Sequence, residues 1–140
     1  MPKIFLGDTG VLCYLRGDTA DSLKNDRNRV GAIMENFVIM EVIKQLSWSS
    51  LGLKPYHFRT HKGVEVDLLL ENRRKEIYGI EVKTSASVSE KDFRGLEYFA
   101  EKNPKNFKKG SYFIQAKNIS ALQKICMLCL YLFYGSSILQ

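Results

Sequence analysis

The stretch from Val64 to Lys83 constrains the fold of this chain most, because it reads as two strands joined by a turn. Apolar residues recur at alternate positions in both halves, and strand side chains alternate between the two faces of a sheet. Residues 72–75 (NRRK) separate the halves and are polar and of hairpin length. The stretch therefore predicts a β-hairpin with one apolar face.

The other face of the predicted hairpin carries charge. Alternation places Glu65 and Asp67 of the first strand and Glu81 and Lys83 of the second on that face. Like charges that lie directly opposite each other destabilise a sheet. The pair Asp67 and Glu81 therefore indicates a cation between the two carboxylates, with the Lys83 ammonium beside it.

The spacing of these residues resembles a known nuclease pattern. Asp67, thirteen residues, Glu81, one residue and Lys83 follow the D-x(n)-E-x-K signature of the PD-(D/E)xK nuclease superfamily. More closely, the chain is similar to a domain of uncharacterised function that follows an AAA-type ATPase module in many prokaryotic proteins. The pieces that carry this similarity occur in the expected order: IFLGDTGV at 4–11, GAIMENFVIME at 31–41, GVEVD at 63–67 and IEVKTS at 80–85.

The order of the expected elements agrees with the α/β fold that this resemblance implies. Residue patterns predict a helix over 29–46, a strand over 53–60, the hairpin, a helix that opens at Ser89 and a strand over 110–115. The resemblance implies a restriction-endonuclease-like αβββαβ core, a mixed central sheet flanked by helices, with the last strand beside the E-x-K strand. We therefore expect a lead-in over 1–27, a nuclease-like core over 28–118 and an apolar segment over 119–140.

The lead-in predicts short elements. Residues 3–6 read as a strand, and Asp8 caps a helix that runs to about Leu15 and stops at Gly17. Residues 18–29 are polar and predict a loop, as do the basic residues 102–109.

Two glutamates on the helix over 29–46 compete for a third carboxylate position. Glu41 projects near the middle of the apolar stripe, and Glu35 lies on its flank. A carboxylate that faces a core is costly unless it is paired or bound to a cation. The resemblance implies a metal-site glutamate on this helix, and the run from Gly31 to Glu35 matches that position. We therefore favour Glu35, and expect Glu41 to pair with a basic residue such as Arg59 or Lys83.

Together these residues predict hydrolysis of phosphodiester bonds. The resemblance implies that Glu35, Asp67 and Glu81 hold Mg²⁺ or Mn²⁺, which favours oxygen ligands. The metal would activate a water for attack on the phosphate, and Lys83 would orient that water or neutralise developing charge. The alternative is a catalytically inactive domain that binds nucleic acid or protein beside an AAA-type ATPase.

Charge favours an anionic partner. The formal net charge is +6 and the sequence pI is about 9.2. Lys62 and the turn residues Arg73, Arg74 and Lys75 are predicted to contact the phosphate backbone of nucleic acid, which positions a duplex without reading its sequence.

The remaining features bound the class of protein. A length of 140 residues suggests one domain, and three cysteines with no apolar signal segment predict a reducing cytoplasm. The chain lacks a P-loop, so an ATPase partner would be a separate module in cis or in trans. Residues 125–134 (ICMLCLYLFY) are too short to span a membrane, and predict a buried element or the interface of a homodimer.

Overall fold

The computed structural model describes residues 3–83 and 90–114, which form a mixed α/β fold. Helices α1 (Thr9–Arg16), α2 (Ala20–Asn25) and α3 (Arg27–Trp48) come first, followed by strands β1 (Lys54–Arg59), β2 (Glu65–Glu71) and β3 (Ile77–Lys83). Helix α4 (Glu90–Lys102) then leads to strand β4 (Phe107–Ile114). From α3 onward this is the predicted order of elements.

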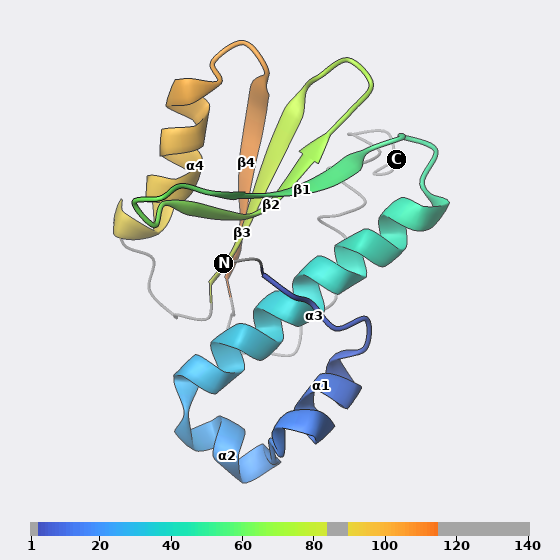
Figure 1. Ribbon diagram of the computed structural model, residues 1–140, viewed down its shortest axis with the longest axis vertical. Coiled ribbons are helices and arrows are strands. Elements are labelled where there is room, and N and C mark those ends of the chain that lie inside the picture. The colour runs from blue at the N-terminus through green and yellow to red at the C-terminus, as the bar shows by residue number, and fades with distance from the viewer. Residues whose placement is uncertain (1–2, 84–89, 115–140) are drawn as a thin grey trace, which may run out of the picture.

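The four strands form one mixed sheet in the order β1-β2-β3-β4 (Figure 1). Strands β1, β2 and β3 are antiparallel neighbours, whereas β4 runs parallel to β3 and its register places Glu81 opposite Tyr112. The prediction that the last strand lies beside the E-x-K strand is therefore confirmed. The parallel pairing is allowed because α4 carries the chain back along the sheet between β3 and β4.

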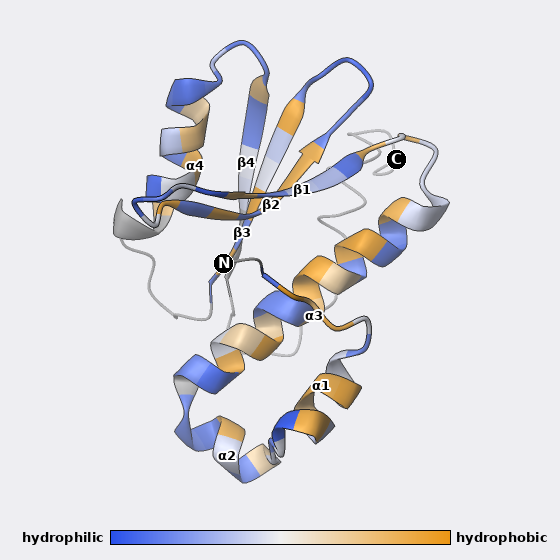
Figure 2. Ribbon diagram, viewed as in Figure 1, coloured by the Kyte–Doolittle hydropathy of each residue, from blue (hydrophilic) through white to orange (hydrophobic). Residues whose placement is uncertain are grey.

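Helices α3 and α4 pack on opposite faces of the sheet, and each face has its own apolar core. On the α3 face the buried residues are Val38, Ile39, Val42, Leu68, Leu70 and Ile80. On the α4 face they are Val66, Leu69, Leu96 and Phe99. Figure 2 shows hydrophobic residues along α3 and in the strands, while the connections at the strand ends are hydrophilic.

The alternation of β2 is interrupted, which corrects the predicted hairpin. Tyr56 pairs with Leu69 but Phe58 pairs with Val66, so Asp67 and Leu68 together stand opposite the single residue His57. This β-bulge inserts one extra residue and reverses the faces on either side of it. Val66 therefore packs with Leu69 on the α4 face rather than with Leu68, as strict alternation had predicted.

The helix ends follow from local capping. Asp8 accepts from the Val11 N–H at 2.9 Å, and Gly17 ends α1 in the left-handed region with φ 65°, as predicted. Asp26 begins α3 by accepting from the N–H groups of Asn28 and Arg29. The predicted Ser89 cap and the apolar segment over 125–134 lie outside the described residues.

Three predictions about the connections were wrong. Residues 3–6 make no strand ladder, and their anchor is instead a pair of hydrogen bonds between Leu6 and the buried Asn36 side chain. The polar stretch after Gly17 contains α2, because Thr19 and Ser22 form a reciprocal capping box. Strand β4 begins at Phe107, so part of the predicted basic loop lies within a strand.

Candidate metal centre

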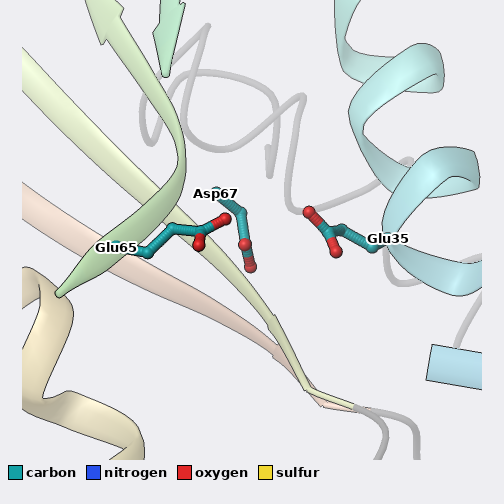
Figure 3. Close-up of side chains that lie close together, drawn as sticks. All are labelled: Glu35, Glu65 and Asp67. Atoms are coloured by element: carbon teal, nitrogen blue, oxygen red, sulfur yellow. The ribbon is translucent and has the colours of Figure 1, made fainter. Parts of the chain in front are cut away.

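Three carboxylates converge where α3 passes the start of β2. Oxygen atoms of Glu35, Glu65 and Asp67 all lie within 4.8 Å of one another. Figure 3 shows the three side chains pointing toward the same space, Glu35 from the helix and the other two from the strand. We call these three residues the acidic cluster.

The bulge in β2 brings Asp67 into the acidic cluster. Because the alternation reverses there, Asp67 turns toward α3, while Leu69, which strict alternation places on the same face, packs on the α4 side. The Asp67 Oδ2 atom accepts a 2.9 Å hydrogen bond from the backbone N–H of Val82. This bond fixes Asp67 against the neighbouring strand, between the two residues of the predicted E-x-K pair.

An ammonium group from the beginning of the chain also contacts the acidic cluster. The Nζ atom of Lys3 forms ion pairs with Glu35, with Glu65 at 2.5 Å and with Asp67 at 3.3 Å. Burial alone lowers the pKa of Lys3, but hydrogen bonds to Glu35 and Glu65 and the charge of Asp67 outweigh it and raise the pKa above its usual range. Lys3 is therefore charged at any physiological pH.

The pKa values of two carboxylates in the cluster shift in opposite directions. Burial raises the pKa of Glu35, and the Asp67 charge adds to this rise while Lys3 opposes it. Burial also tends to raise the pKa of Glu65, but Lys3, His57 and Arg59 together lower it below its ordinary value. Carboxylates whose environments separate their pKa values are typical of functional sites as well as of ion-pair networks.

The E-x-K pair lies on the other face of the sheet, which corrects the prediction that Asp67 and Glu81 share a face. Glu81 is 3% exposed, and its Oε2 atom pairs with Lys83 Nζ at 3.2 Å. Its Oε1 atom points toward α4, where an added Cβ at Gly95 would lie 2.2 Å from it. Among the described residues, this oxygen has no hydrogen-bond partner.

The environment of Glu81 disfavours its charged form. Burial raises the pKa of Glu81, Lys83 opposes this rise, and the charge of Asp67 adds to it. The two carboxylates thus influence each other electrostatically although they belong to different faces. A backbone hydrogen bond from Leu96 favours the charged form of Glu81, as Lys83 does, but burial has the larger effect.

A pocket of about 230 Å³ opens beside Glu81. Its cationic lining side chains are Lys62, Lys83 and Arg94. Glu65 lines it too, but Glu81, Arg94 and Gly95 place the pocket on the α4 side of the sheet, whereas Glu35 approaches the acidic cluster from α3. The cationic side chains of the pocket complement an anion such as a phosphate group.

The predicted basic contacts separate into two groups. Lys62 lies at the pocket, whereas the exposed Arg73, Arg74 and Lys75 lie in the β2–β3 turn at the opposite end of β2. Seven residues of strand separate the two ends, about 23 Å at 3.3 Å per residue. The turn therefore cannot contact the same phosphate as the pocket. Lys75 is also paired with Glu71 at 2.9 Å.

The structure distinguishes the two helix glutamates. Glu35 enters the acidic cluster, while Glu41 pairs with Lys44 one helical turn away at 2.7 Å rather than with Arg59 or Lys83. Sequence reasoning missed Glu65 and Lys3 as members of the site. Glu65 could have been found, because it is two residues from Asp67; Lys3 gave no local signal, because it lies 62 residues from Glu65.

The acidic cluster fits a hard divalent cation. Oxygens on opposite sides of an octahedral Mg²⁺ lie about 4.2 Å apart, given metal–oxygen distances of about 2.1 Å. The cluster spans at most 4.8 Å between its selected oxygens and consists of carboxylates alone. Small side-chain movements would bring these oxygens to coordination distance.

Comparison with known proteins identifies relatives but no activity. The family described as "Domain of unknown function (DUF4143)" matches residues 30–133, a range that takes in most of α3, all of α4 and the whole sheet. Two uncharacterized proteins, Mb2031c of Mycobacterium bovis and Rv2008c of Mycobacterium tuberculosis, are each 36% identical over 89 residues. The match covers 63% of this chain and 19% of each relative. No solved structure matches the chain significantly. None of the described helices has the length and hydropathy needed to cross a membrane.

Proposed function

Because the chain belongs to the DUF4143 family, a domain of unknown function, we propose its activity from its own geometry: divalent-cation-dependent hydrolysis of phosphodiester bonds in nucleic acid. The observation that carries this proposal is the convergence of Glu35, Glu65 and Asp67 within 4.8 Å. The restriction-endonuclease-like core and the PD-(D/E)xK resemblance belong to the same proposal. The observed order of elements and the parallel β3–β4 pair support both.

Each group in the proposed reaction has a separate role. Glu35, Glu65 and Asp67 would hold Mg²⁺ or Mn²⁺, which polarises a phosphate and lowers the pKa of bound water. Lys83 and Lys62 line the pocket on the α4 side of the sheet and would bind a phosphate of the same nucleic acid there. Glu81 positions Lys83 through their 3.2 Å ion pair.

The exposed basic turn would add contacts away from the reacting bond. Arg73, Arg74 and Lys75 lie beyond the end of β2, which is four residues or about 13 Å from Asp67, about four base pairs on a duplex whose charges repeat every 3.4 Å per strand. Such contacts support binding to an extended nucleic acid rather than to a mononucleotide.

One observation favours a second candidate function, a catalytically inactive domain that binds nucleic acid or protein. The Glu81 carboxylate faces α4 rather than the acidic cluster, so the predicted ligands are divided between two faces. The curated relatives are about five times longer than the matched region, which leaves room for an AAA-type ATPase module in cis. In this second function the domain would recognise a partner for that module.

The two functions are separated by metal binding together with cleavage. We would titrate the protein with MnCl₂ by calorimetry and incubate it with supercoiled plasmid in Mn²⁺ or Mg²⁺. The test variant is Asp67→Asn, which keeps an oxygen for the Val82 N–H but removes the charge. The matched control is Glu41→Gln, whose carboxylate pairs with Lys44 outside the acidic cluster.

Hydrolysis predicts metal binding and nicking that Asp67→Asn removes and Glu41→Gln retains. Metal binding without nicking would favour the binding domain instead. If millimolar Mn²⁺ produces no binding heat in the wild type, and none in a variant without Lys3, the metal centre itself is wrong.

A further inference from the structure

The Lys3 ammonium occupies the place where a cation would neutralise the acidic cluster. Its Nζ contacts an oxygen of each of the three carboxylates, Glu35, Glu65 and Asp67. The Lys3 side chain is 26% exposed, and the three carboxylates are between 14% and 23% exposed. This arrangement differs from an ordinary surface ion pair, because one ammonium group contacts all three partly buried carboxylates at once.

A divalent ion and this ammonium cannot occupy the acidic cluster together. The selected carboxylate oxygens span at most 4.8 Å, so a cation among them would lie within a few ångströms of Nζ. Two cations at such a distance repel strongly in a partly buried site. A metal also needs oxygens of the same three carboxylates that Lys3 contacts, because Mg²⁺ takes oxygen ligands in close octahedral coordination.

The segment that carries Lys3 is held in place by the residues that follow it, Phe5 and Leu6. The backbone of Leu6 donates to Asn36 Oδ1 at 2.8 Å and accepts from Asn36 Nδ2 at 3.0 Å. Phe5 packs against the core on the α3 face. Ile4, between this anchor and Lys3, is 85% exposed. Lys3 can therefore leave the cluster by rotation near Ile4, without disturbing α1 or the Leu6–Asn36 bonds.

We propose that Lys3 is an intramolecular gate of the metal centre: it neutralises the acidic cluster in the metal-free protein and must leave before a divalent cation binds. This inference rests on the proposed function, since it assumes that the cluster receives a metal. It adds that metal affinity is set by competition with the chain's own N-terminal segment. Anything that draws this segment away, such as a partner module, would raise metal affinity without touching the ligands.

The first test compares Mn²⁺ binding to the wild type, Lys3→Gln and a matched control, Lys24→Gln. Lys24 is 76% exposed on α2 and pairs weakly with Asp21 at 3.6 Å, so its substitution removes the same charge outside the cluster. Competition predicts that Lys3→Gln binds Mn²⁺ about tenfold more tightly than the wild type. Lys24→Gln should bind as the wild type does.

A second measurement uses the wild type and does not depend on how a variant folds. An amine-reactive reagent followed by mass spectrometry reports the accessibility of Lys3, with the exposed Lys24 as internal reference. Labelling of Lys3 should be low without metal and should rise severalfold in saturating Mn²⁺, while labelling of Lys24 stays constant.

The outcomes separate the gate from the metal centre. Equal Mn²⁺ affinity of Lys3→Gln and wild type, or saturating Mn²⁺ without increased labelling of Lys3, would overturn the gate and leave the metal centre standing. If neither the wild type nor Lys3→Gln binds Mn²⁺, the proposed metal centre fails and the gate fails with it.

Discussion

The Glu81 carboxylate lies directly against Gly95 of α4, so that a Cβ at position 95 would stand 2.2 Å from Glu81 Oε1. The same Cβ would stand 2.1 Å from the backbone oxygen of Glu65, which cannot move aside without disturbing β2. Gly95 therefore lets α4 approach the sheet beside the pocket and the E-x-K pair.

Substitution of Gly95 by alanine should destabilise the protein by about 1–3 kcal/mol, because an extra methyl group has no space in a packed interior. The control is Gly7→Ala, since a Cβ at Gly7 would meet nothing within 4 Å. Urea denaturation of both variants measures the difference in free energy of unfolding. Equal stability of the two variants would show that α4 does not pack closely on the sheet at this position.

The raised pKa of Glu81 predicts a dependence of stability on pH. Burial favours the protonated carboxyl in the folded state, so its contribution is complete below the ordinary glutamate pKa and is lost as pH rises through the raised pKa. The Glu81→Gln variant cannot ionise at this position, so it does not lose this stability as pH rises. Without metal, we expect Glu81→Gln to gain stability relative to wild type as pH rises from about 4 to 8. Parallel pH profiles would mean that the Glu81 environment does not disfavour its charge.

The buried Asn36 should be a principal anchor of the N-terminal segment. Its side chain accepts a hydrogen bond from the Leu6 N–H and donates one to the Leu6 carbonyl oxygen. It also donates to Thr9 Oγ1 at 3.0 Å. Asn36→Ala should cost about 1–3 kcal/mol, because polar groups lose their partners. Asn28→Ala, at an exposed position near the start of the same helix, is the control and should change stability little. Urea denaturation distinguishes them, and equal stability of the two variants would show that Asn36 does not anchor the segment.

The sequence by itself determined the elements that depend on neighbouring residues. The hairpin, the helix over 29–46 and the ends of α1 follow from periodicity and capping, which act over a few residues. The parallel pairing of the last strand beside β3 was confirmed as well, although its prediction came from the resemblance rather than from local pattern.

The tertiary structure decided which side chains meet. Strict alternation placed Glu65 and Asp67 on the face of Glu81, but in the bulged sheet Glu65 and Asp67 meet Glu35 while Glu81 faces α4. The bulge changes the faces of the residues that follow Asp67, and it depends on the register between two strands, so neither strand's own pattern reveals it. The contact of Lys3 with Glu65 joins residues 62 positions apart, and no local rule of spacing or capping reaches across that distance. Chain geometry within a few residues thus fixed the elements, while packing between layers fixed the composition of the acidic cluster.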